Sequence, residues 1–263
     1  MTKQNAKTIR RNRLIMKQFV NMGQRCLGHG RSSTIGAKTL CQSAFRAVFP
    51  LRTQIIQTRP DGSDEKVIQK AAESILAGRV VALPSESGYV LAADPFNLSA
   101  IADVFRAKGR ELHRALPILV DSLTMAEDYA ADSLSPQFLL LARRFWPGPL
   151  TIITSASRLL PLKVTGNSGR LAVRQDSHAV PNRLIERLER PIIATSANRS
   201  GHSTCRSGIE VFGTMDGRVH LILDAGESDR LPATTVDITL PQWSVIKAGA
   251  ITEAQLDDCL SGA

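Results

Sequence analysis

The sequence predicts an α/β domain built around a mixed β-sheet. Segments with apolar residues at helical spacing alternate with short apolar runs through most of the chain after residue 60. Clusters of polar residues follow these runs or close the helices, which is where α/β scaffolds carry their sites. With 263 residues, 43% of them apolar, the chain is long enough to bury one globular core.

Residues 1–60 differ from the rest of the chain in charge. They hold twelve Lys and Arg residues and no Asp or Glu, whereas residues 61–263 hold 21 basic and 24 acidic residues. We therefore expect a basic, poorly ordered N-terminal extension over 1–60 and a single folded domain over 61–263. An acid-free, Arg-rich segment is typical of an extension without a role, a nucleic-acid-binding arm or an organelle transit peptide.

Composition also narrows the class of protein. No apolar run approaches the roughly 18 residues that a membrane-spanning helix needs, so we expect no membrane partner. Cys26, Cys41, Cys205 and Cys259 form no CxxC pair, and the five histidines show no metal-ligand spacing. We expect no disulfide framework, no metal site and a cytoplasmic location, with a mitochondrial one as the alternative if 1–60 is a transit peptide.

The first predicted elements are a helix over 64–76 and a strand over 79–83. A serine or an aspartate at its start can cap the helix, its apolar residues recur at helical spacing, and Gly78 supplies a left-handed stop. The run RVVAL is typical of a buried strand, which Pro84 is expected to end.

The same alternation continues to the end of the chain. Gly109 is expected to close the second helix, and Ser135 to cap the third with Pro136 in its first turn. The predicted helices cover 98–108, 135–146, 179–189 and 252–260, and the predicted strands cover 116–120, 150–156, 170–175, 191–198, 234–240 and 243–249.

Lys108 and Arg110 lie on either side of Gly109 at the end of a predicted helix. The glycine frees the backbone, so both cations can reach one anion. Arginine binds phosphate or carboxylate through two hydrogen bonds, and lysine acts as a point charge. The alternative is a solvated basic helix end, which the helix dipole also favours.

A second cluster, IIATSANRSG, places Ser196 and Asn198 just after an apolar strand. A hydroxyl, a carboxamide and the backbone amides of a turn can together hold a phosphate or a carboxylate. An ordinary polar turn explains the same residues equally well. Arg174, at the end of RLAVR, is a further candidate phosphate ligand, with an edge-strand arginine as its alternative.

Taken together and in order, seven segments resemble the motifs of the YrdC family of threonylcarbamoyl-AMP synthases, also called TsaC. The resemblance extends from about residue 64 to about residue 252. The segments are PSESGYVLA, Lys108-Gly109-Arg110, FWPGPLTII, LAVRQDSH, ATSANRSG, ATTVDIT and IKAGAIT.

The resemblance implies a twisted, open mixed sheet with a concave, positively lined cavity in one catalytic domain over 61–263. It implies an enzyme that joins L-threonine, bicarbonate and ATP into threonylcarbamoyl-AMP and releases pyrophosphate. The product would serve the N6-threonylcarbamoyl modification of adenosine 37 in tRNA, with a TsaD-type transferase as partner. Mg²⁺ would accompany ATP, since a triphosphate is normally carried with it.

The resemblance also implies roles for individual residues. Lys108 and Arg110 would be catalytic and would meet the charge of bicarbonate, carboxylate and α-phosphate. The ATP-binding residues would be Lys108, Arg110, Arg174, Ser196, Asn198, Thr234 and Thr235, and the substrate-binding residues would be Ser85, Tyr89 and Arg174.

The first motif departs most from the family pattern. Ser85 and Ser87 replace threonines, Gly88 replaces a valine, and Val90 and Ala92 replace glycines. The SGY piece is similar to the YciO branch of the same superfamily, whose members lack the KxR and SAN residues. This chain keeps both, which favours the synthase.

Two alternative functions stay open from the sequence. One is a non-catalytic, YciO-type protein that binds double-stranded RNA or rRNA, to which the basic extension would add salt-sensitive affinity. The other keeps the fold and changes the acceptor, as in the YrdC-like domains of carbamoyltransferases. A further departure, Lys247 in place of a family arginine, keeps the charge but not the two-pronged grip.

Overall fold

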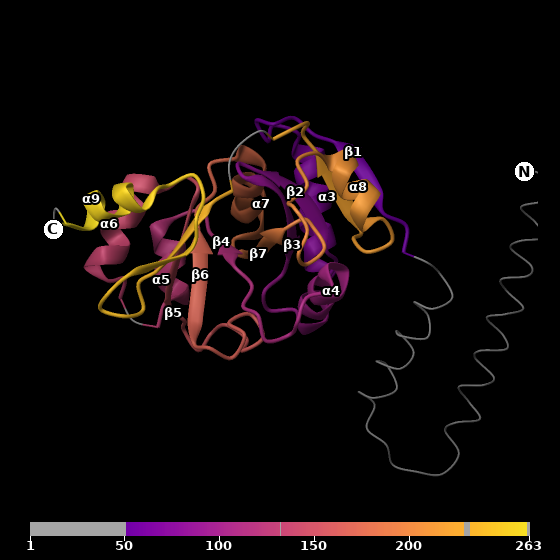
Figure 1. Ribbon diagram of the computed structural model, residues 1–263. Coiled ribbons are helices and arrows are strands. Elements are labelled where there is room, and N and C mark those ends of the chain that lie inside the picture. Colours follow the sequence, from indigo (N-terminus) through magenta and orange to yellow (C-terminus); the bar gives the residue numbers. More distant parts are fainter. Residues whose placement is uncertain (1–50, 132, 229–231, 262–263) are drawn as a thin grey trace, which may run out of the picture. The chain divides into compact units, whose positions relative to one another are not determined.

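The computed structural model describes residues 51–131, 133–228 and 232–261 (Figure 1). The prediction of a poorly ordered extension therefore falls, for residues 1–50, outside the described residues. Residues 51–60 were assigned to the same extension, but they belong to the folded unit. Within them β1 (Gln54–Gln57) pairs in parallel with β8 (Leu221–Asp224). The folded domain therefore begins before Asp61.

Helices and strands alternate along the described chain as the sequence predicted. The strands are β1, β2 (Val81–Ser85), β3 (Gly88–Ala93), β4 (Ile118–Leu119), β5 (Leu150–Ser155), β6 (Arg170–Arg174), β7 (Ile192–Ser196), β8, β9 (Thr234–Asp237) and β10 (Ser244–Lys247). The helices are α3 (Glu65–Leu76), α4 (Leu98–Lys108), α5 (Leu123–Tyr129), α6 (Pro136–Phe145), α7 (Ala179–Leu188), α8 (Gly208–Met215) and α9 (Glu253–Ser261).

The ten described strands form one open, mixed sheet, which confirms the predicted fold class. Their order is β1-β8-β2-β3-β7-β4-β6-β5-β9-β10. The pairs β1/β8, β8/β2, β4/β6 and β5/β9 are parallel, and the other neighbours are antiparallel.

Two apolar cores cover the two faces of the sheet. Successive side chains of a strand point to opposite faces, so Ala82 joins one core while Val81 and Leu83 join the other. The core that contains Val81 is closed by α3 and α7, and the core that contains Ala82 by α4, α6, α8 and α9. Figure 1 shows α6 and α9 together at the C-terminal end of the sheet.

Local signals set the ends of several helices. The side chain of Ser135 accepts the backbone N–H of Phe138, with Pro136 in the first turn of α6, as predicted. Gly109 ends α4 in the left-handed region, with φ of 59°. Asp64 precedes α3, but its side chain accepts the backbone N–H of Arg59 at 2.6 Å and makes no cap hydrogen bond.

Pro84 does not end the strand, contrary to the prediction, but lies within β2 opposite Tyr89 of β3. Proline has no N–H to donate, so it fits only where the ladder needs none. β8 pairs only with Val81 and Ala82 of β2, and Tyr89 donates its own N–H to Cys205. No ladder hydrogen bond is therefore lost at Pro84.

Glu86 and Ser87 form the turn between β2 and β3. Gly88 follows with φ of 104°, a conformation that favours glycine over side chains with a Cβ. A Cβ at Gly88 would lie 2.9 Å from Thr204 Cγ2. The glycine at this position, where the family motif has valine, thus fits this tight turn. None of the helices in the described part of the chain is long and apolar enough to span a bilayer.

Candidate functional site

Two cavities border the turn between β2 and β3. Ser87 lines one, which has a volume of 210 Å³, and Ser85 and Glu86 line the other, which has a volume of 720 Å³. We call the smaller one the cationic cavity and the larger one the acidic cavity, after the charged side chains in their walls.

The cationic cavity gathers three positive side chains from distant parts of the chain. Arg110 follows α4, Arg174 ends β6 and Lys247 ends β10. The other lining residues are Ser87, Val90, Pro117, Ile118, Leu119, Thr151, Ala194, Thr195, Ser196, Thr204, Pro232, Ala233 and Thr235. Cations surrounded by hydroxyl groups form a site suited to phosphate or carboxylate groups.

Arg174 is held by four side chains. Nη1 donates to Glu86 Oε1 at 3.1 Å and to Ser87 Oγ at 2.9 Å. Nη2 donates to Asp176 Oδ2 at 2.8 Å and to Ser85 Oγ at 3.2 Å. Two carboxylates therefore fix the orientation of the guanidinium and offset its charge.

Arg110 is the least compensated of the cations in this wall. It donates to the carbonyl of Ala115 at 2.8 Å and lies 3.5 Å from Thr195 Oγ1, and within the described residues it makes no ion pair. Its buried Nε has no hydrogen-bond partner. Burial, with a smaller contribution from Arg114, lowers the pKa of Arg110. A bound anion would supply the missing partner.

Lys108 lies behind the wall, under the turn after β7. Its ammonium donates to the backbone carbonyls of Ser196 and Asn198 and to Asn198 Oδ1, the last at 2.9 Å. Only 3% of the residue is exposed, and it lines neither cavity. Burial, followed by the charge of Arg110, lowers the pKa of Lys108 to about 7, although the three acceptors favour the ammonium.

Asn198 links this lysine to Ser196. Its Oδ1 accepts hydrogen bonds from Lys108 and, at 2.5 Å, from Ser196 Oγ, while its amide nitrogen donates to the carbonyls of Arg199 and His202. Ser196 lines the cationic cavity and Asn198 does not. The amide of Asn198 is thus used within the protein.

The two neighbouring threonines of β9 differ in position. Thr234 is fully buried, and its hydroxyl donates to the carbonyl of Ile251 at 2.7 Å and accepts the N–H of Ile251 at 2.9 Å. Thr235 lines the cationic cavity. This alternation follows from the pleat of the strand.

Ser85 and Tyr89 lie on the other side, along the acidic cavity. Ser85 donates to Asp176 Oδ2 at 2.5 Å. The hydroxyl of Tyr89 lies 3.0 Å from Asp224 Oδ1 and 2.8 Å from the carbonyl of Gly226, and burial raises its pKa. Of the three residues predicted on the amino-acid side, Arg174 alone lines the cationic cavity.

Glu86 is the site residue that sequence reasoning missed. It is 4% exposed, and its carboxylate accepts from Arg174 on Oε1 and from Ser177 on Oε2, the latter at 2.5 Å. Burial and the nearby Asp176 raise the pKa of Glu86, and Arg174 opposes this shift. Its position in a turn directly after a buried strand was the available signal.

Within the described residues, no group of three or more His, Cys, Asp or Glu side chains is arranged to hold a metal ion. Cys205 and Cys259 are buried free thiols.

Comparison with known proteins adds a family model and a set of relatives. The model Sua5_yciO_yrdC, described as telomere recombination, matches residues 73–249. The threonylcarbamoyl-AMP synthase of Pyrococcus abyssi is 37% identical over 191 residues, which are 73% of this chain and 55% of the relative. The synthase of Alkalilimnicola ehrlichii is 33% identical over 183 residues, which are 69% of this chain and 95% of the relative.

Solved structures give the same picture. The structure of P. abyssi Sua5 complexed with L-threonine has a TM-score of 0.74 and 32% identity, and the match covers 79% of this chain and 60% of that one. E. coli YciO, at 22% identity, shares the fold, with a TM-score of 0.72 over 78% of this chain and 99% of that one. The chain thus spans little more than half the length of the archaeal proteins it matches.

Proposed function

The chain belongs to the Sua5/YciO/YrdC family, and from this premise we propose that it is a threonylcarbamoyl-AMP synthase. The substrates are L-threonine, bicarbonate and ATP, and the products are threonylcarbamoyl-AMP and pyrophosphate. The observation that carries the proposal is the cationic cavity, in which Arg110, Arg174 and Lys247 meet beside hydroxyl groups.

The chemistry brings several anions together in one place. The threonine nitrogen forms a bond with the carbon of bicarbonate and water leaves, which gives a carbamate. An oxygen of the carbamate then attacks the α-phosphorus of ATP, and the bond to pyrophosphate breaks. Fixed cations lower the cost of bringing these groups together and need no covalent intermediate with the protein.

We assign Arg110 to the charge that passes between bicarbonate and the α-phosphate, because this buried cation has no ion-pair partner among the described residues. Arg174 carries two carboxylate partners, so it serves to orient the amino acid or its carbamate rather than to supply net charge. Lys108 and Asn198 act behind the wall and hold Ser196 in place.

The volume of 210 Å³ is smaller than the roughly 300–1,000 Å³ typical of small-molecule pockets. The cavity is therefore assigned to the reacting ends of the substrates. The remainder of ATP would lie toward Lys247, which is exposed. Mg²⁺ enters with ATP as part of the substrate. The product passes to a TsaD-type transferase for tRNA modification, and the cytoplasm is the proposed location.

The test is pyrophosphate release by the full chain with ATP, bicarbonate and threonine. Release should require threonine, and Arg110→Ala should lower it at least about 100-fold, since transition-state cations and donors contribute on this scale. Arg114→Ala, an exposed arginine in the same loop, is the matched control and should retain activity. Release that does not depend on threonine would contradict the proposal.

A further inference from the structure

The acidic cavity lies where a sheet of this kind is expected to hold a ligand. β1 and β2 both pair in parallel with β8, so their carboxyl ends meet at one edge. Pro60 follows β1, Glu86 follows β2, and residues 225–228 follow β8, and all of these line the cavity. Ligands of open α/β sheets bind in the crevice at such carboxyl ends.

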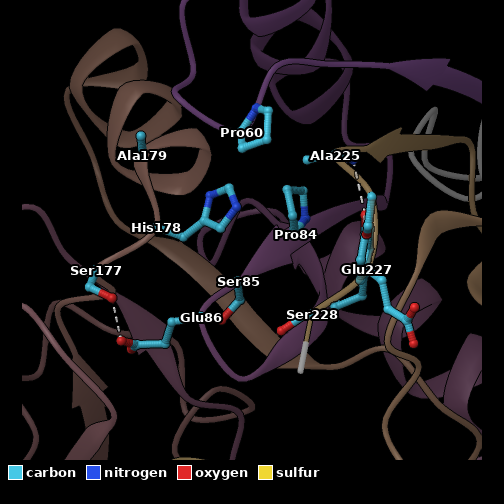
Figure 2. Close-up of a pocket in the computed structure, with 12 residues that line it drawn as sticks. Pro60, Pro84, Ser85, Glu86, Ser177, His178, Ala179, Ala225, Glu227 and Ser228 are labelled. Carbon is cyan, nitrogen blue, oxygen red and sulfur yellow. Dashed lines mark hydrogen bonds between the residues drawn. The ribbon is translucent and has the colours of Figure 1, made fainter. Parts of the chain in front are cut away.

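The walls combine apolar rings with hydroxyl groups. Figure 2 shows the rings of Pro60, Pro84 and His178 on one side of the cavity, and Ser85 and Ser228 on the other. The volume of 720 Å³ lies within the roughly 300–1,000 Å³ of small-molecule sites. The cavity therefore has the size and the mixed lining of a site for a small organic molecule.

The charge beside this cavity is negative. Glu86 and Asp176 share one guanidinium, that of Arg174, and all three side chains are at most 7% exposed. Two carboxylates and one guanidinium leave one negative charge, and Glu86 is the member that lines the cavity. Among the described lining residues there is no lysine or arginine. The cationic cavity has the opposite character.

Glu86 also keeps acceptor capacity. Its two oxygens each accept one hydrogen bond, from Arg174 and from Ser177, whereas a carboxylate offers about four acceptor positions. Burial of a carboxylate that is only partly compensated is costly, and a cation brought alongside relieves the cost. The raised pKa of Glu86 agrees with incomplete compensation.

We propose that the acidic cavity binds a small organic cation with a primary ammonium group, and that Glu86 is its counter-ion. The ammonium would donate to the carboxylate, while the carbon chain would lie against the proline rings. This site is separate from the synthase reaction, which we place in the cationic cavity, so either proposal can fail while the other holds.

The experiment compares two probes of similar shape and different charge on the full chain. 1,4-Diaminobutane and 1,4-butanediol are titrated by ligand-observed NMR at neutral pH, where the diamine is protonated. The diamine should bind saturably, and the diol should bind at least about tenfold more weakly, because charge-assisted hydrogen bonds are the stronger ones. Equal binding of the diol and the diamine would overturn the proposal.

Three variants locate the binding. Glu86→Gln should weaken diamine binding at least about tenfold. Glu227→Gln is the matched control, because this carboxylate lines the same cavity with 65% of its side chain exposed, and it should change binding by less than about threefold. Ala179→Leu fills the cavity without touching a carboxylate and should abolish binding. Unchanged binding in Ala179→Leu overturns the proposal even if Glu86→Gln fails to fold.

Discussion

The ammonium of Lys108 lies 2.9 Å from the side-chain carbonyl of Asn198, ninety residues further along the chain. This contact joins the end of α4 to the turn after β7, and through Ser196 it reaches the wall of the cationic cavity. Two of the motifs that the sequence suggested as separate phosphate ligands are thus one connected unit.

Asn198→Ala should therefore damage both stability and activity. It removes an acceptor from Lys108 and from Ser196, which should lower the free energy of unfolding by about 1–3 kcal/mol. We expect pyrophosphate release to fall at least about tenfold, because Ser196 loses its fixed position. Urea unfolding and the pyrophosphate assay measure the two effects. Ser200→Ala, an exposed serine of the same turn, is the control and should change neither.

The burial of Lys108 should make stability depend on pH. Its pKa falls from 10.5 to about 7 on folding, so between these values the unfolded chain binds more protons than the native one. The contribution of Lys108 to the free energy of unfolding should therefore rise with pH above about 7, by at most about 1.4 kcal/mol per pH unit. Below pH 7 both states are protonated, and the contribution should be constant.

Comparison with Lys108→Met isolates this effect. The difference in the free energy of unfolding between the wild type and this variant, measured in urea from pH 6 to pH 9, should shift in favour of the wild type as pH rises. A difference that stays flat over this range would show that the ammonium keeps its proton, held by the carbonyls of Ser196 and Asn198.

Arg174 should be essential for stability as well as for activity. Arg174→Ala leaves Glu86 and Asp176 buried without their shared cation, which should cost about 3–5 kcal/mol in urea unfolding. Arg170→Ala, at the other end of β6, removes an ion pair in which the arginine is 47% exposed and should cost about 1 kcal/mol or less. Equal losses in the two variants would contradict the picture of a buried cluster.

The threonines of β9 should separate a structural role from a functional one. Thr234→Val breaks the hydrogen bonds to Ile251 and should lower the free energy of unfolding by about 1–3 kcal/mol. Thr235→Val should leave stability within about 0.5 kcal/mol and raise the KM for ATP or threonine, since this side chain lines the cationic cavity. The reverse assignment of the two effects would refute the geometry.

Much of the fold could be predicted because its signals are local. The Ser135 cap with Pro136, the left-handed Gly109 and the helical spacing of apolar residues located α3, α4, α6, α7 and α9. β1, β3 and β8, like the short helices α5 and α8, were missed. β3 is buried on both faces, so it has no alternating pattern, and the other two strands have only four residues each.

The site divides in the same way. The sequence by itself determined which residue types were available for anion binding, and the order of the motifs determined the family. Only the tertiary structure decided that Arg110 and Thr235 line the cationic cavity, that Lys108 and Thr234 lie behind it, and that Ser85 lies toward the acidic cavity. The physical reason is that caps and periodicity act within a few residues, whereas burial and pairing depend on contacts such as Ser85 to Asp176, 91 residues apart in the chain.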